Sequence, residues 1–478
     1  MECLNMKKSK PLVEALEYFI RKEPVSLHVP GHKNGLISGL PKSIRQALTY
    51  DVTELTGLDD YHHPEEAIAE AEELLAEAYN SDNSFFLVNG STVGNLAMIY
   101  AVCNAGDTII VQRNAHKSIF HAIELVGANA VFVAPEWDEH TSTPGSVATN
   151  TLMDALQRFP EAKAVVFTYP TYYGVTSKHL EEQILYCHQK RIPVLIDEAH
   201  GAHFIASKNL PKSALELGAD IVVQSAHKTL PAMTMASFLH VKSDIVSADK
   251  VNDYLRMLQS SSPSYLLMAS LDDARHYVAN YMESDYHLLK EKRASFIGAL
   301  KRIPTLQIVE ADDPLKLILR AEKYGGYELK EALEQEGIYV ELADTEQVLL
   351  VLPLLKQGIV YPFTNITIKI KEALKKLTLQ PKTKLKQTTI QLDIEKVTTL
   401  EMPIKDVQLA EKEWISYTKA IGRIAAEMII PYPPGIPLFL KGEKITVAKL
   451  AYLAELQSLG ADFQGNHQLG ENRICVIK

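Results

Sequence analysis

A short apolar run near the middle of the chain turns abruptly polar, and its last residue could do covalent chemistry. The β-branched residues 221–223 predict a buried strand, which Ser225, His227 and Lys228 follow. In parallel sheets covered by helices, ligands bind beyond the carboxyl ends of the strands. At such an edge the Lys228 amine could form a Schiff base with a carbonyl compound. Taken alone, an ordinary surface lysine after a strand would give the same pattern.

A second polar segment follows the predicted strand 84–88. Ser91 and Thr92 stand in a glycine-containing turn that precedes a predicted helix over 96–103. Free backbone N–H groups, two hydroxyls and the helix dipole favour an anion such as a phosphate at this point. A plain Ser/Thr helix cap is the alternative interpretation.

Two more side chains stand where predicted strands end. Asp197 closes the strand 193–197, and His116 follows the strand 108–111. Together with Lys228 and the Ser91 turn, they match what pyridoxal 5'-phosphate requires. The pyridine nitrogen needs a carboxylate, the aldehyde an amine, the phosphate a helix amino terminus, and the ring a flat side chain for stacking. Each signal is weak alone, but their conjunction predicts a pyridoxal-phosphate site.

The predicted elements alternate between strands and helices up to about residue 285. This alternation predicts an α/β fold with a mostly parallel, doubly wound sheet. Smaller α+β units are expected after it. The further predicted strands are 130–134, 164–168, 219–225, 305–310, 316–320 and 347–353, and the helices include 64–80, 151–159, 179–190, 211–217, 286–302, 327–336, 407–427 and 445–458.

Composition narrows the classes of protein. The chain has 478 residues, of which 46% are hydrophobic and 23% charged, and a net charge of -10, which argues against nucleic-acid binding. It contains no apolar run of membrane-spanning length and no apolar signal core, so we expect no membrane association and a cytoplasmic location. The four cysteines are scattered without a C-x-x-C pair, which fits a reducing compartment.

Two alternative motifs are rejected. Residues 197–200 spell Asp-Glu-Ala-His, as in a helicase nucleotide box, but the chain lacks the phosphate loop that such a box requires. His200 and His203 are spaced like metal ligands, but no third ligand stands at metal-site spacing. We therefore predict no metal site.

Taken together, these motifs resemble those of the Orn/Lys/Arg decarboxylases, which belong to the fold-type I pyridoxal-phosphate enzymes. The similarity runs from about residue 10 to 475 and is closest to short bacterial members without an amino-terminal wing domain. The segments that carry it are His28–Lys33, Leu58–Pro64, Asn89–Thr92, Arg113–Ser118, Asp197–Gly201, Ser225–Lys228, Ser260–Tyr265, Ala269–Asp272 and Pro431–Pro437.

The resemblance implies roles for individual residues. Lys228 would be the Schiff-base lysine, Asp197 the partner of the pyridine nitrogen and His116 the stacking residue. Phosphate binding would fall to Ser91, Thr92, Ser225 and His227. His200 would also line the cofactor site, although the large degradative members carry Trp there, so their rates and substrate preference should not be assumed.

The resemblance also implies an assembly and a domain order. The loop with Ser261 and Ser262 is similar to one that the family inserts into the neighbouring subunit's cofactor site, so a homodimer with shared active sites is expected. The domains would be an amino-terminal arm (1–45), a large cofactor-binding domain (46–285), a small α+β domain (286–385) and a carboxyl-terminal decarboxylase-type domain (386–478).

The expected reaction is decarboxylation of arginine, lysine or ornithine to a polyamine-type amine. Lys228 and His227 are the candidate proton donors. By charge alone, Asp51, Glu54, Asp59 and Asp60 could bind the distal cation of the substrate, or they could form a solvated acidic loop. The alternatives are another fold-type I reaction, such as aminotransfer or α-oxoamine synthesis, and a non-catalytic cofactor-binding protein.

Overall fold

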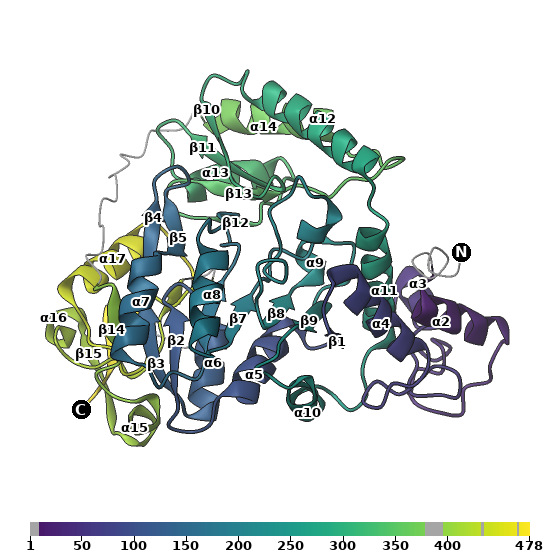
Figure 1. The fold of residues 1–478 in the computed structure, drawn as a ribbon. Coiled ribbons are helices and arrows are strands. Elements are labelled where there is room, and N and C mark those ends of the chain that lie inside the picture. The colour runs from purple at the N-terminus through teal and green to yellow at the C-terminus, as the bar shows by residue number, and fades with distance from the viewer. Residues whose placement is uncertain (1–8, 378–394, 432–434, 466–467) are drawn as a thin grey trace. The chain divides into compact units, whose positions relative to one another are not determined.

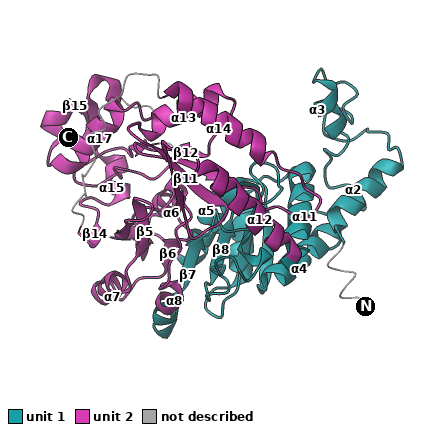
Figure 2. Ribbon diagram, turned by 90° about the horizontal axis from the view of Figure 1, so that it is seen from above, with its two compact units in different colours: residues 1–102, 184–283 teal, residues 103–183, 284–478 magenta. Residues whose placement is uncertain are grey.

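The computed structural model describes residues 9–377, 395–431, 435–465 and 468–478 (Figure 1). The chain forms two compact units (Figure 2). Unit 1 comprises residues 1–102 and 184–283, and unit 2 comprises residues 103–183 and 284–478. The predicted α/β class with a large, mostly parallel sheet is confirmed. The predicted domain division at residues 45, 285 and 385 stays a prediction, and residues 1–8 and the boundary at 385 lie outside the described residues.

In unit 1, the strands that precede the predicted site residues all run in the same direction. Its helices and strands are α2 (Pro11–Arg21), α3 (Lys42–Ala47), α4 (Ala67–Tyr79), β1 (Asn83–Leu87), α5 (Gly90–Val102), β7 (Val194–Asp197), β8 (Ile221–Gln224), α9 (Ala226–Thr229), β9 (Ser237–Val241), α10 (Ala248–Leu258) and α11 (Tyr265–Ala279), with a 3-10 turn at Phe204–Ala206. The strand order is β1-β9-β8-β7. Strands β7 and β8 are parallel, and β9 is antiparallel to both β8 and β1. Therefore β1, β7 and β8 point their carboxyl ends the same way.

Helix α5 packs closely on this part of the sheet because of one glycine. A Cβ atom at Gly94 would lie 2.8 Å from side-chain carbons of Leu87 on β1 and Val223 on β8. Only glycine allows the helix to approach the strands at this distance. The close approach fixes the start of α5 beside the carboxyl ends of β1 and β8.

Unit 2 contains the other strands of the large sheet, a four-stranded antiparallel sheet and several two-stranded pairs. Its elements are β2 (Thr108–Gln112), α6 (Lys117–Val126), β3 (Asn129–Val133), β4 (Pro135–Asp138), β5 (Thr143–Val147), α7 (Thr149–Arg158), β6 (Val165–Thr168), β10 (Leu306–Glu310), β11 (Lys316–Ala321), α13 (Gly326–Gln335), β12 (Leu342–Ala343), β13 (Val348–Val351), α14 (Phe363–Leu377), β14 (Val397–Thr399), α15 (Ile404–Leu409), β15 (Lys412–Ser416), α16 (Tyr417–Ala420), β16 (Ile430–Pro431), α17 (Val447–Ser458), β17 (Phe463–Gln464) and β18 (Arg473–Ile477). Helices α8 (Leu180–Gln189) and α12 (Glu283–Leu300) each contain residues of both units.

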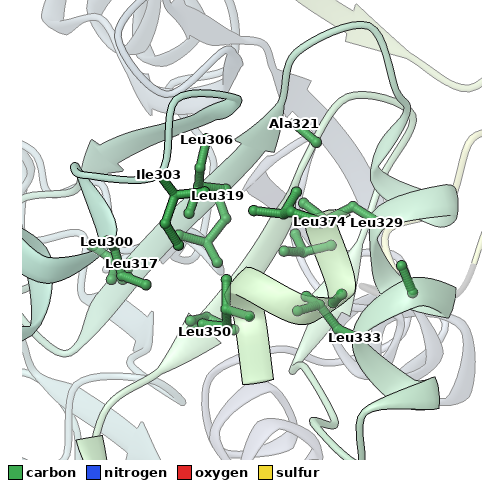
Figure 3. Close-up of a cluster of buried hydrophobic side chains, with 14 of the residues drawn as sticks. Leu300, Ile303, Leu306, Leu317, Leu319, Ala321, Leu329, Leu333, Leu350 and Leu374 are labelled. Atoms are coloured by element: carbon green, nitrogen blue, oxygen red, sulfur yellow. The ribbon is translucent and has the colours of Figure 1, made fainter. Parts of the chain in front are cut away.

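The strands of unit 2 fall into several groups, of which β6, β2, β3 and β14 belong to the large eight-stranded sheet. Strand β2 is parallel to both β3 and β6, and β14 is antiparallel to β3. The antiparallel sheet β10-β11-β13-β12 is covered by an apolar cluster that includes Leu300, Leu329 and Leu374 from α12, α13 and α14 (Figure 3). A smaller core joins α17 to the β15-β18 pair through residues such as Leu453 and Val476.

Two predicted helices are wrong. Residues 214–217 form a turn and residues 211–213 have no regular structure, because the Ala214 N–H donates to Oε1 of Glu198 at 2.7 Å instead of to a helical carbonyl. Residues 407–427 contain the end of α15, then β15 and α16. In β15, Trp414 and Ile415 pair with Cys475 and Ile474 of β18, so a distant strand overrides the local pattern. No helix in the described ranges has both the length and the apolar character needed to cross a membrane.

Candidate active site

Asp197 is the last residue of β7 and is buried. Its Oδ2 accepts a hydrogen bond of 3.0 Å from Nδ2 of Asn95, whereas its Oδ1 has no hydrogen-bond partner among the described residues. Burial raises the pKa of Asp197, against the lowering effect of the Lys228 charge and of hydrogen bonds from Asn95 and Ala199. The side chain is thus a buried carboxyl with one oxygen available to a further N–H donor.

Lys228 stands in α9, directly after β8, and is half-buried. Its Nζ lies 3.2 Å from Nε2 of the buried His200. It is also near enough to Asp197 for its charge to affect the pKa of that carboxyl. The parallel pairing of β7 and β8 therefore brings the predicted amine and the predicted ring partner together.

His227 has a ring that is fixed by the backbone. Its Nδ1 lies 3.0 Å from the carbonyl oxygen of Ala236. Since a carbonyl oxygen only accepts, Nδ1 carries the hydrogen. This contact fixes the orientation of the His227 ring, which directly precedes Lys228 in the sequence.

The predicted phosphate turn is the first turn of α5, which begins at Gly90 and not at residue 96 as predicted. Gly90 has a φ of +77°, a conformation that side chains disfavour. Ser225 Oγ donates to Ser91 Oγ at 2.8 Å, so the hydroxyls at the ends of β8 and β1 meet. Thr92 is exposed in the same turn. Backbone N–H groups and hydroxyls at a helix start form an arrangement suited to a phosphate.

The loop of Ser261 and Ser262 is exposed and follows α10. Its first residue, Ser260, donates its N–H to Oδ1 of Asn89 at 3.3 Å and accepts at its carbonyl a contact of 2.9 Å from Nε2 of His62. The loop is therefore anchored next to the turn that carries Ser91.

His116 lies in unit 2, at the amino cap of α6. Its Nδ1 accepts from the Ser118 N–H at 3.3 Å and lies 2.8 Å from Ser118 Oγ. Its stacking on a cofactor ring stays a prediction.

The acidic loop proves to be partly structural. Asp59 caps α4, because its carboxylate accepts hydrogen bonds from the backbone N–H groups of Glu65, Glu66 and Ile68 at 2.9–3.0 Å. Burial acts against ionisation, but these bonds outweigh it and keep the pKa of Asp59 below its usual value. Asp51 contacts His32 at 3.1 Å. For Asp59, these contacts favour the structural interpretation over substrate binding.

Asn95 is a site residue that sequence reasoning did not identify. It stands one turn after Ser91 in α5 and is buried. The signal was present in the sequence, because Asn95 is a polar residue within the apolar helix pattern, and such residues usually meet a buried polar partner.

Comparisons with known proteins agree with this geometry. The family model "Orn/Lys/Arg decarboxylase, major domain" matches residues 10–311, and the corresponding C-terminal domain model matches residues 383–468. The chain is 47% identical to the Bacillus subtilis protein described as "Uncharacterized protein YaaO" over 98% of both chains. It is 34% identical to an arginine decarboxylase of Halalkalibacterium halodurans over 99% of both chains.

A solved structure supports the fold. The lysine decarboxylase LdcF of Francisella novicida superimposes with a TM-score of 0.81 at 19% identity, over 98% of this chain and 81% of that one. These matches show the family, and with it the reaction type and the cofactor, which is pyridoxal phosphate. The chain therefore belongs to the Orn/Lys/Arg decarboxylase family and is an amino-acid decarboxylase.

Proposed function

We propose that the chain decarboxylates a basic L-amino acid, with arginine as the preferred substrate and agmatine and carbon dioxide as products. The observation that carries this choice is the end-to-end similarity to the Halalkalibacterium halodurans arginine decarboxylase. Lysine and ornithine remain the alternative substrates. The polyamine-type product and the cytoplasmic location predicted from the sequence are part of the same proposal.

The residues around Asp197 fit pyridoxal phosphate. Oδ1 of Asp197 is a buried acceptor without a partner among the described residues, and a protonated pyridine nitrogen would supply the missing donor. The bonded hydroxyls of Ser91 and Ser225 at the start of α5 fit the phosphate. The Lys228 amine, which contacts His200, fits the covalent attachment point.

Each side chain has a proposed task. When bound, pyridoxal phosphate supplies a ring that accepts the electron pair left when carbon dioxide departs. Asp197 holds negative charge beside the ring nitrogen. His200, at 3.2 Å from Nζ, exchanges a proton with Lys228, and Lys228 or His227 returns a proton to the α-carbon. His116 is proposed to stack on the ring.

The homodimer with shared sites is also proposed. Its support is an exposed apolar arm between residues 25 and 44, in which Val25, Leu27, Leu36 and Ile37 each have exposed fractions of 74–92%. Several large apolar side chains exposed on one short segment are typical of a protein interface. Light scattering on Leu27→Glu and Leu36→Glu variants should show a lower mass than for the parent protein, whereas an unchanged mass would contradict this role for the arm.

The substrate is tested with one panel. Purified full-length protein, loaded with pyridoxal phosphate, is given arginine, lysine and ornithine, and agmatine, cadaverine and putrescine are measured. We expect agmatine to form fastest and the Lys228→Ala variant to form no amine. Faster formation of cadaverine or putrescine would overturn arginine as the substrate. Keto acid without any amine would overturn basic amino-acid decarboxylation by this chain.

A further inference from the structure

The loop that carries His116 is held by residues from far along the chain. This loop joins β2 to α6. Before His116, the buried guanidinium of Arg113 donates from Nη1 to the carbonyl oxygen of Pro437 at 2.8 Å and from Nη2 to that of Leu438 at 3.2 Å. These bonds fix the entry of the loop on the carboxyl-terminal segment.

The residue after His116 is held in the same way. The Lys117 N–H donates to the carbonyl oxygen of Gly435 at 3.3 Å, and its Nζ donates to Oε1 of Gln464 at 2.5 Å. His116 is therefore bracketed on both sides by contacts to residues 435–464. Its own ring contacts Ser118, through the Ser118 N–H at 3.3 Å and Oγ at 2.8 Å from Nδ1.

Glu443 organises this contact. Its Oε2 lies 3.0 Å from Nη2 of Arg113, and it accepts the Leu440 N–H at 3.0 Å and a hydrogen bond from Lys449 Nζ. Burial opposes ionisation of Glu443, but the charges of Arg113 and Lys449 outweigh it and lower its pKa. A carboxylate shared by two cations at a buried contact holds all three in one arrangement.

We propose that Glu443 is a positioning residue: by holding Arg113 it fixes the His116 loop, and thereby the orientation of His116 at the cofactor ring. The inference rests on the proposed role of His116. Glu443 lies in the region that matches the carboxyl-terminal family model, residues 383–468, and His116 lies in the region that matches the major-domain model. The proposed role of the first region is therefore to position a residue of the second.

The test is a double-mutant cycle on cofactor binding. Full-length apoprotein is titrated with pyridoxal phosphate and followed by absorbance for the parent, Glu443→Gln, His116→Ala and the double variant. We expect Glu443→Gln to raise the dissociation constant about 10-fold when His116 is present, as for residues that orient a ligand-contacting side chain. In the His116→Ala background the same change should have less than about a 2-fold effect.

Equal effects in both backgrounds would show that Glu443 acts on the fold alone and would overturn the proposal. If Glu443→Gln does not fold, Gln464→Ala replaces it in the same cycle. This variant removes the acceptor of Lys117 Nζ and so tests the contact that follows His116 in the chain. The matched control is Glu413→Gln, since Glu413 pairs with Arg423 at 2.8 Å in the same region. It should show no coupling.

The cycle is independent of the substrate. A positive cycle together with failure in the amine panel would leave the positioning role intact and overturn the proposed reaction. Amine formation without coupling between Glu443 and His116 would support the proposed reaction and overturn the positioning role.

Discussion

Asn95 donates from Nδ2 to Oδ2 of Asp197 at 3.0 Å, so the two oxygens of that carboxylate differ in their hydrogen bonding. Oδ2 is held by the helix α5, while Oδ1 has no partner among the described residues. The same helix starts with Ser91, which bonds Ser225. One rigid helix therefore orients both the proposed ring partner and the proposed phosphate site.

We predict that Asn95→Ala weakens pyridoxal-phosphate binding about 10-fold, since residues that orient a ligand-contacting group typically contribute this much. The measurement is absorbance titration of the apoprotein. Asn150→Ala is a matched control, because Asn150 is exposed in the first turn of α7. Equal affinity of the Asn95→Ala and parent proteins would contradict the orienting role.

The amino-terminal helix α2 depends on a buried ion pair. Asp272 of α11 accepts the N–H groups of Leu12 and Val13 at 3.0 and 3.4 Å and pairs with the fully buried Arg275. Asp272→Ala leaves Arg275 buried without this carboxylate, so we expect the free energy of unfolding to fall by about 3–5 kcal/mol. Urea denaturation measures the loss.

The neighbouring residue provides the control for this prediction. Asp273 pairs with Lys10 at 3.1 Å, and both side chains are partly exposed. Asp273→Ala should cost less than about 1 kcal/mol. A loss as large as that of Asp272→Ala would show that burial does not distinguish the two pairs.

The strand-ends that carry the site were predictable because their signals are local. A β-branched run followed at once by Ser225 and Lys228, or by Asp197 and His200, marks a buried strand that ends in polar groups. The structure adds that β1, β7 and β8 point the same way, through the antiparallel β9 that sequence reasoning did not identify. Strand direction depends on pairing, which no local pattern encodes.

The errors come from tertiary contacts. Residues 412–416 carry charged and apolar residues at spacings compatible with a helix, yet they pair with Arg473–Ile477. Likewise, Glu198 accepts a hydrogen bond from the Ala214 N–H, which is then not available for a helix at 211–217. In both places, the deciding partner is distant in sequence.

The stability of the protein should fall at alkaline pH partly because of Glu72. Burial raises its pKa from 4.5 to about 8, against a hydrogen bond from the Phe86 N–H and with a contribution from the Asp59 charge. The folded state thus binds a proton that the unfolded state releases above about pH 4.5. The stability linked to this proton is complete below that pH and is lost as the pH rises through about 8.

Glu72→Gln removes this titration while keeping an acceptor for the Phe86 N–H, which bonds Oε1 at 2.8 Å. We expect the variant to gain stability relative to the parent between pH 5 and pH 9, by at most about 5 kcal/mol at about 1.4 kcal/mol per pKa unit. Thermal midpoints across this range measure the gain. Glu73→Gln, on the exposed neighbour in α4, is the matched control.

His200 is predicted to affect turnover more than cofactor binding. Its Nε2 lies 3.2 Å from Lys228 Nζ, where it can exchange a proton with the amine. His200→Phe keeps a ring in the buried position but removes both nitrogens, so we expect kcat to fall about 100-fold, the lower end of what a positioned proton-transfer group contributes. The dissociation constant of pyridoxal phosphate should change less than about 3-fold, because the proposed role of His200 is in turnover and not in holding the cofactor. His63→Phe is the control, because His63 is exposed and pairs only with the exposed Glu65 among the described contacts. If His200→Phe lost the cofactor in proportion to its activity, His200 would be a binding residue and its proposed role in proton transfer would be wrong.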